Sequence, residues 1–116
     1  MNVRFTAESI RCRLTAAEFD LLKSARAAEL LVPLPRNHTF KINLRPSALN
    51  QWQLASDPTG IWITVPSLEL MSLAENLPSK EGIEHSFDLE TGAISVVLEV
   101  DVRKRQDGTQ GAQKET

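Results

Sequence analysis

Hydrophobic and polar residues alternate along the first part of this chain and then change to a helical spacing. Residues 2–5 and 10–14 place every second side chain on one face, which predicts two strands paired as a hairpin. Residues 15–25 follow at once, with Thr15 and Glu18 as a capping-box pair in front of spaced apolar residues. We therefore expect a hairpin that leads directly into a short helix.

Two further alternating stretches, residues 29–34 and 39–45, are separated by turn-forming residues and predict a second hairpin. Three side chains of its second strand are expected to face inward: Phe40, Ile42 and Leu44. Three others are expected to face outward: Lys41, Asn43 and Arg45. The polar segment 46–60 then predicts a linker that carries a short strand near residues 51–55.

The second half of the chain repeats this order. Residues 60–65 alternate, residues 66–77 have helical spacing behind Pro66, and residues 83–102 form a hairpin pattern whose turn holds Gly92. A shift of 51 positions aligns the strand–helix pattern of the first half with that of the second. We interpret the match as two ββαββ repeats; the alternative is that any amphipathic strand followed by a helix would match in this way.

This order of elements predicts an α+β fold, a curved and mainly antiparallel sheet or open barrel with two short helices against it. The same pattern also fits two packed sheets, so the strand order stays open. We expect a single domain over residues 1–102, with halves 1–50 and 51–102. The polar residues 103–116 are expected to form a flexible tail.

Composition agrees with a folded globular chain. Of 116 residues, 41% are apolar and 24% are charged, values typical of a globular domain. The sequence has neither an apolar run of membrane length nor a signal-peptide segment, so we expect no membrane contact and a cytoplasmic location. Cys12 is the one cysteine and alternates with Ile10 and Leu14, which predicts a buried thiol and excludes an intrachain disulfide.

Charge is divided unevenly along the chain, although the net charge is only −2. Residues 1–58 carry eight basic and five acidic side chains, whereas residues 59–102 carry one basic and eight acidic. Strand alternation directs five basic residues outward in the first half: Arg4, Arg11, Arg13, Lys41 and Arg45. It directs five acidic residues outward in the second half: Glu84, Asp88, Glu90, Glu99 and Asp101.

These outward charges have two interpretations. The first is cross-strand pairing, within the chain or across a dimer, in which each exposed pair stabilises the structure by at most about 1 kcal/mol. The second is a binding surface, with an anion held by cationic side chains and a metal ion held by acids. The anion site would consist of Arg11, Arg13, Lys41 and Arg45, and the metal site of Glu99 and Asp101.

Motifs for catalysis or cofactor binding are not found in the sequence. His38 lies in a predicted turn and His85 on an apolar strand face, so we assign both to structural roles. We find no phosphate loop, nucleophile elbow or metalloprotease helix and expect no cofactor. Nucleic acid is disfavoured as a partner because the domain is acidic and only 5% of its residues are aromatic. Trp62 would either anchor a protein interface or belong to the core under a loop with Trp52.

The last predicted strand carries Glu99, Asp101 and Lys104, alternating acids followed by a lysine. This pattern resembles the motif of the triphosphate tunnel enzymes, whose charged antiparallel barrels bind triphosphate and magnesium. The resemblance implies a phosphate or polyphosphate site that uses a metal. In that family the motif lies near the N-terminus of a longer chain, and its lysine is displaced by one residue relative to Lys104.

A second resemblance rests on a basic strand, a strand of the pattern SIR-x-RLT and a capped helix. The residues that carry it are Val3, Arg4, Ser9, Ile10, Arg11, Arg13, Leu14, Thr15 and Glu18. In these residues the chain resembles the start of a group of small bacterial proteins known only as a domain of unknown function. The resemblance implies a bacterial origin and a small α+β domain, and it transfers no activity.

We therefore expect a non-enzymatic binding or protein-interaction domain that associates with itself or with another protein. The alternative is a protein that binds or hydrolyses phosphate or polyphosphate, with the cationic side chains on the anion and the acids on a metal. The alternative requires the charged side chains of both halves to converge in one cavity, and a small anion stays open as a ligand.

Overall fold

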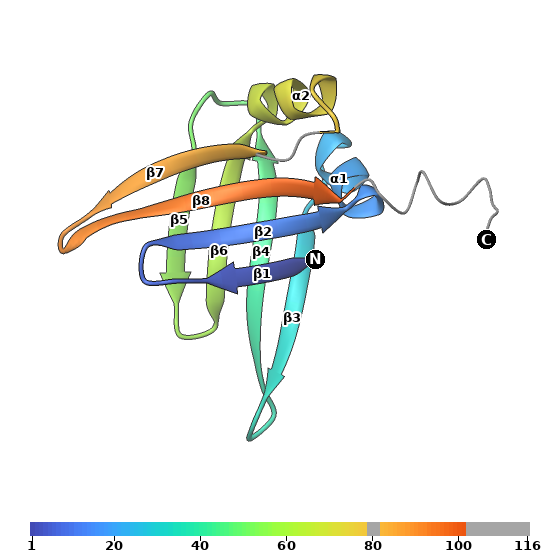
Figure 1. Cartoon of the computed structure of the whole chain (residues 1–116). Helices are drawn as coiled ribbons and strands as arrows, with labels where there is room; N and C mark the ends of the chain where they lie inside the picture. Colours follow the sequence, from blue (N-terminus) through green and yellow to red (C-terminus); the bar gives the residue numbers. More distant parts are fainter. Residues whose placement is uncertain (79–81, 102–116) are drawn as a thin grey trace.

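The computed structural model describes residues 1–78 and 82–101, which form two four-stranded sheets and two helices (Figure 1). Sheet A contains β1 Asn2–Phe5, β2 Ser9–Thr15, β7 Ile83–Leu89 and β8 Gly92–Asp101. Sheet B contains β3 Ala28–Leu34, β4 His38–Ser47, β5 Gln53–Asp57 and β6 Gly60–Pro66. The helices are α1 Ala16–Lys23 and α2 Ser67–Glu75. The tail predicted over residues 103–116 lies outside the described residues.

Each sheet joins two antiparallel hairpins through a central parallel pair. The strand order is β1-β2-β8-β7 in sheet A and β3-β4-β6-β5 in sheet B. Because β2 runs parallel to β8, and β4 parallel to β6, each sheet takes one hairpin from each half of the chain. The α+β fold with two similar ββαββ units is confirmed. Of the arrangements that the pattern left open, the described residues adopt two sheets, whose central pairs are parallel.

The repeat predicted from the sequence is visible in the structure. A shift of 51 positions carries β2 onto β6 and the first residue of α1 onto the first residue of α2. A shift of 54 positions carries Lys41, which pairs with Gly60, onto Ser95, which pairs with Ser9. The second unit is thus three residues longer from the start of its helix to the start of its last strand, while the pairing of the central strands is kept.

Both helices begin directly where a central strand ends. The Thr15 hydroxyl accepts a hydrogen bond from the Glu18 N–H and the Glu18 carboxylate accepts one from the Thr15 N–H, so the predicted capping box is confirmed. α1 ends at Lys23, and Ala25 turns the chain with a positive φ of 63°. α2 follows Pro66, which has a suitable φ for a helix start but no side-chain cap. The two helices lie side by side at one end of the sheets (Figure 1).

A hydrophobic core lies between the two sheets and against the helices. Alternate residues of β2 and β8 enter it from sheet A, and alternate residues of β4 and β6 enter it from sheet B. The buried members are Ile10, Cys12, Leu14, Phe19, Leu22, Ala28, Leu44, Ile63, Val65, Leu70, Leu73, Val96, Leu98 and Val100. The predicted burial of Cys12 is confirmed, and burial raises the pKa of its thiol to about 12. Since both inner faces meet in this core, the outer faces point away from each other.

Three details of the strands refine the expectations. Asn43 lies on an outer face as predicted, yet it is only 5% exposed because its neighbours cover it. β5 begins at Gln53, two residues later than expected. Gly92 starts β8 with a φ of 149°, which confirms the predicted use of glycine in that turn.

Among the described helices, none is both long and apolar enough to span a membrane.

Candidate functional site

The outer face of sheet A is divided by charge across its strand order. We name the outward arginines of β1 and β2 the arginine half: Arg4, Arg11 and Arg13. We name the outward acids of β7 and β8 the acidic half: Glu84, Asp88, Glu99 and Asp101. Because β2 and β8 are neighbours at the centre of the sheet, the border between the halves follows this parallel pair.

The arginine half lines a hollow of about 250 Å³ together with Asn2 and Glu99, which we name the arginine hollow. The hairpin register explains the cluster, because Arg4 lies directly opposite Arg11 and Asn2 lies opposite Arg13. Like charges directly opposite each other on neighbouring strands destabilise a sheet. Since three guanidinium groups face one carboxylate, the hollow is positively charged.

The three arginines differ in their partners. Arg11 forms an ion pair with Glu99 across the border between β2 and β8. The Arg11 side chain is 45% exposed and the Glu99 side chain 16%, so the carboxylate is the better shielded of the two. Within residues 1–78 and 82–101, the side chains of Arg4 and Arg13 make no hydrogen bond or ion pair. Their guanidinium N–H donors are therefore available to a ligand.

A second hollow, of about 330 Å³, adjoins the arginine hollow at the end of β2. The two hollows share Asn2 and Arg13, and the second is also lined by Thr15, the N-cap of α1, and by Asp101 at the end of β8. Arg13 thus stands between two open spaces on the same face. An anion bound at Arg13 would have room on either side.

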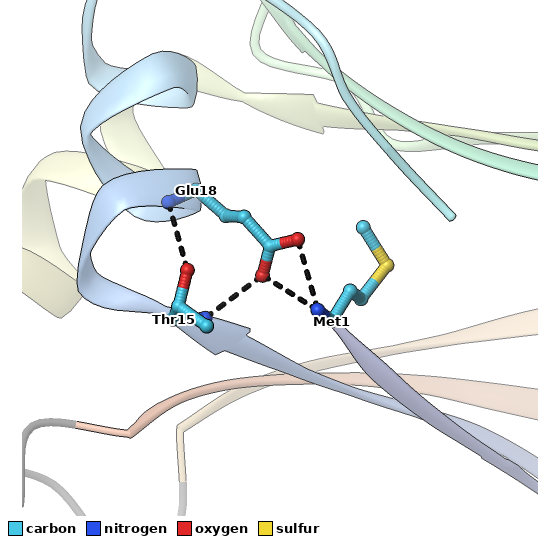
Figure 2. A network of polar contacts seen from close by, with 3 residues as sticks. All are labelled: Met1, Thr15 and Glu18. Carbon is cyan, nitrogen blue, oxygen red and sulfur yellow. Dashed lines mark hydrogen bonds and ion pairs between the residues drawn. The ribbon is translucent and has the colours of Figure 1, made fainter. Parts of the chain in front are cut away.

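Glu18 holds the N-terminal ammonium of Met1 beside this second hollow. The ammonium nitrogen lies 2.9 Å from each oxygen of the Glu18 carboxylate, and one of these oxygens also accepts the Thr15 N–H (Figure 2). Partial burial by itself raises the pKa of Glu18. The hydrogen bonds from Thr15 and from the ammonium, with its charge, outweigh burial and hold the pKa below its ordinary value. The terminal ammonium is thereby neutralised within the chain.

The other two predicted anion ligands, Lys41 and Arg45, lie on the outer face of sheet B. Lys41 Nζ lies 3.5 Å from a Glu29 carboxylate oxygen, and Arg45 Nε donates to Asn43 Oδ1 at 3.0 Å. Asn43 Nδ2 donates in turn to Glu29 at 2.7 Å. Because the two outer faces point away from each other, the structure does not bring this pair to the arginine half.

Trp62 lies on the same outer face of sheet B, half-buried. It pairs in register with Asn43 on one side and with Ala55 on the other. Trp52 packs against the core instead, and its ring stacks on His85 with centroids 5.3 Å apart and planes 8° apart. The position of Trp62 on an outer face does not identify a partner, so its interface role stays a prediction.

The two acids predicted to hold a metal, Glu99 and Asp101, lie two positions apart on the same face of β8. Glu99 is engaged by the Arg11 guanidinium. Among the described residues, no group of three or more histidine, cysteine, aspartate or glutamate side chains is arranged to hold a metal ion. The geometry therefore favours Glu99 as a counter-ion of the arginines.

The two histidines lie in different surroundings. His38 begins β4 at an exposed position, and His85 packs between Trp52 and Phe87, whose ring centroid lies 4.8 Å away in an edge-to-face arrangement.

Arg4 was expected on an outward face but not in the anion site. The hairpin register supplies the missing signal, because it sets Arg4 opposite Arg11.

Comparison with known proteins gives a family and no activity. A model of DUF7009, a family of unknown function, matches residues 1–111. The chain belongs to this family. The match confirms the family resemblance found in the first residues and extends it over nearly the whole chain; a bacterial origin stays a prediction. No curated protein and no solved structure matched the chain.

Proposed function

We propose that the chain is a non-enzymatic binding domain that associates with a second copy of itself through the outer face of sheet A. The division of this face into an arginine half and an acidic half supports the proposal most strongly. A face that carries opposite charges in separate halves is complementary to itself. Two-fold symmetric interfaces require such self-complementarity, and matched charges favour one orientation of the two copies.

The strand order favours one direction for the proposed two-fold axis. An axis parallel to the strands, above the border between β2 and β8, would bring β1 of one copy over β7 of the other. In the register of the sheet, Arg4, Arg11, Val97 and Glu84 form one row, so Arg4 would face Glu84 of the second copy. An axis across the strands would place arginines over arginines and would be disfavoured by repulsion.

An interface built on exposed charges should be weak and sensitive to salt. The Debye length shortens from about 30 Å at 0.01 M to about 3 Å at 1 M ionic strength, so charge pairing between two exposed faces is screened. We therefore expect dimers at low salt that dissociate as the salt concentration rises. The fraction of the chain in dimers would then depend on the chain concentration and on charged ligands that compete for the same face.

A charge-swap series tests the proposal. Sedimentation or light scattering from micromolar to millimolar chain concentration at low salt should give a dimer for the parent chain. Arg4→Glu and Glu84→Arg should each weaken the dimer, and the double variant should restore it, because the facing charges are exchanged. Arg26→Glu, at an exposed position between α1 and β3, makes the same charge change away from the face and serves as the control.

Two outcomes would contradict the proposal. A parent chain that is monomeric over the whole concentration range would remove self-association. Single variants that dimerise as well as the parent would remove this face as the interface, because each reverses a charge that the expected contact sets against an opposite charge of the second copy.

A further inference from the structure

We propose that the arginine hollow of a single chain binds a phosphate-bearing anion, which Arg4 and Arg13 hold and which displaces Glu99 from Arg11. The hollow forms within one chain, so this site does not depend on self-association. It also differs from the site expected from the sequence, because Lys41 and Arg45 belong to the other sheet and Arg4 takes their place.

The first support is the arrangement of like charges in the hollow. Arg4 and Arg11 are directly opposite each other in the β1–β2 hairpin, and Arg13 is the next outward residue of β2. This arrangement is unfavourable for an isolated sheet because neighbouring guanidinium groups repel each other. A bound anion with more than one negative charge would turn the repulsion into attraction.

The second support is the number of free donors. Glu99 accounts for Arg11, whereas the side chains of Arg4 and Arg13 have no hydrogen-bond or ion-pair partner in the described part of the chain. A guanidinium group carries five N–H donors in a planar fork that matches two oxygens of a phosphate. Asn2, opposite Arg13, adds an amide that can donate to a further oxygen.

The third support is size. A water molecule occupies about 30 Å³ in the liquid, so a hollow of about 250 Å³ has room for a phosphate group and its remaining hydration. The adjoining hollow shares Asn2 and Arg13 but is also lined by Asp101, so the two phosphate groups of pyrophosphate would bind at Arg4 and Arg13 rather than deep in that second hollow. We therefore expect pyrophosphate to bind more tightly than orthophosphate.

Glu99 competes with a bound anion for Arg11 and so lowers the affinity of the site. Its carboxylate is the one acid that lines the arginine hollow among the described residues, and it already occupies Arg11. An anion that engages all three arginines must compete with this carboxylate. Removing the Glu99 charge should consequently tighten binding more than removing an equal charge elsewhere on the same face.

Isothermal titration with orthophosphate and pyrophosphate, at constant ionic strength set with sodium chloride, tests the site. We expect saturable binding of one anion per chain. Arg13→Ala should weaken it by about tenfold, because the variant loses charge-assisted hydrogen bonds to the anion. Arg26→Ala, which removes an exposed arginine outside the hollow, should bind like the parent.

Glu99→Gln and Glu84→Gln form the second matched pair. Both remove one negative charge from the outer face of sheet A, but only Glu99 lines the hollow. We expect Glu99→Gln to tighten pyrophosphate binding more than Glu84→Gln does. Equal effects of the two variants would mean that only the general charge of the face matters, and would overturn the proposed displacement.

Absence of saturable binding, or equal binding by Arg13→Ala and Arg26→Ala, would overturn the site. If Arg13→Ala does not fold, Arg13→Lys keeps the charge but loses the planar fork and should still weaken binding. Light scattering on the same samples separates this site from the proposed function. A dimer formed through this face would cover the arginine hollow, so the titration is made at a chain concentration at which light scattering reports a monomer. A monomer that binds no pyrophosphate overturns only the anion site, and binding by a chain that stays monomeric up to millimolar concentration removes only self-association.

Discussion

Glu18 joins three parts of the chain through one carboxylate. Its carboxylate accepts a hydrogen bond from the Thr15 N–H, which caps the first turn of α1, and it forms an ion pair with the Met1 ammonium (Figure 2). The Glu18 side chain is 21% exposed. A negative charge at a helix N-terminus is also favoured by the helix dipole. The Thr15 and Glu18 spacing predicted the cap, whereas the ammonium as a third partner depends on where β1 runs.

Replacing Glu18 by Gln should lower the free energy of unfolding by about 1 kcal/mol at neutral pH. Because the folded-state pKa of Glu18 is lowered, its contribution is fully present above the ordinary pKa of 4.5 and is lost as the pH falls through the lower folded value. The difference between the parent and Glu18→Gln should therefore shrink below about pH 4.5. Urea unfolding at a series of pH values measures it.

Glu90→Gln is the control for this pH dependence, since Glu90 lies exposed in the turn between β7 and β8. Its difference from the parent should stay small at every pH. A Glu18→Gln difference that is constant from neutral pH to about pH 3 would contradict a lowered pKa at this residue.

At the scale of elements, the central parallel pair of sheet B depends on a glycine. A Cβ atom at Gly60 would lie 2.3 Å from the carbonyl oxygen of Lys41 on β4, and this oxygen belongs to the backbone. The strands would have to separate to admit it. The alternating pattern of β6 predicted a strand from this position but contained no sign of the close approach, because β4 is a partner from elsewhere in the chain.

Gly60→Ala should therefore destabilise the chain by about 2 kcal/mol, the usual range for an added carbon without space. The equivalent position in β2 is Ser9, which already carries a Cβ, and Ser9→Ala should change stability by less than about 0.5 kcal/mol. Thermal or urea unfolding of both variants makes the comparison. Equal stability of Gly60→Ala and the parent would mean that β4 and β6 do not approach this closely.

At the scale of the whole molecule, Trp52 and His85 connect the two sheets. Trp52 directly precedes β5 at the edge of sheet B, and His85 belongs to β7 at the edge of sheet A. Their rings are stacked, and Phe87 meets the His85 ring from another side. The alternation of residues 83–87 placed His85 on an inward face, but its partner became known only when the sheets were assembled.

His85→Ala should lower the free energy of unfolding by about 1 to 2 kcal/mol, because two aromatic contacts are lost. In a Trp62→Phe background, the remaining emission reports Trp52 and should shift to longer wavelength as its ring loses its cover. His38→Ala, at an exposed strand end, should leave both readings unchanged. A His85→Ala variant as stable as the parent would show that the stacking does not help to hold the sheets together.

The two halves of the chain should not fold separately. Each sheet combines one hairpin from each half through the parallel pairs β2–β8 and β4–β6, so a half taken alone loses both central pairings. We expect fragments 1–50 and 51–116 to lack a cooperative thermal transition by circular dichroism, and their mixture to regain one. A fragment that melts cooperatively by itself would contradict this interlocked arrangement.

The candidate site was predicted in part. The alternation in residues 9–15 correctly directed Arg11 and Arg13 to one outward face, since side chains alternate along any strand. Lys41 and Arg45 are also outward, but on the other sheet. Periodicity assigns a residue to a face of its own strand and contains no information on which strands share a sheet, so grouping all four residues in one site exceeded what the pattern could support.

The elements, the capping box and the inward and outward faces follow from the spacing of residues that are close together in the chain, and the repeat is the same spacing found again 51 positions later. The contacts between charged residues depend instead on how the strands assemble. Arg11 and Glu99 lie 88 positions apart in the chain and form an ion pair because β2 and β8 became neighbours. That choice depends on burying the inner faces of both sheets and two helices in a shared core, a property of the whole chain.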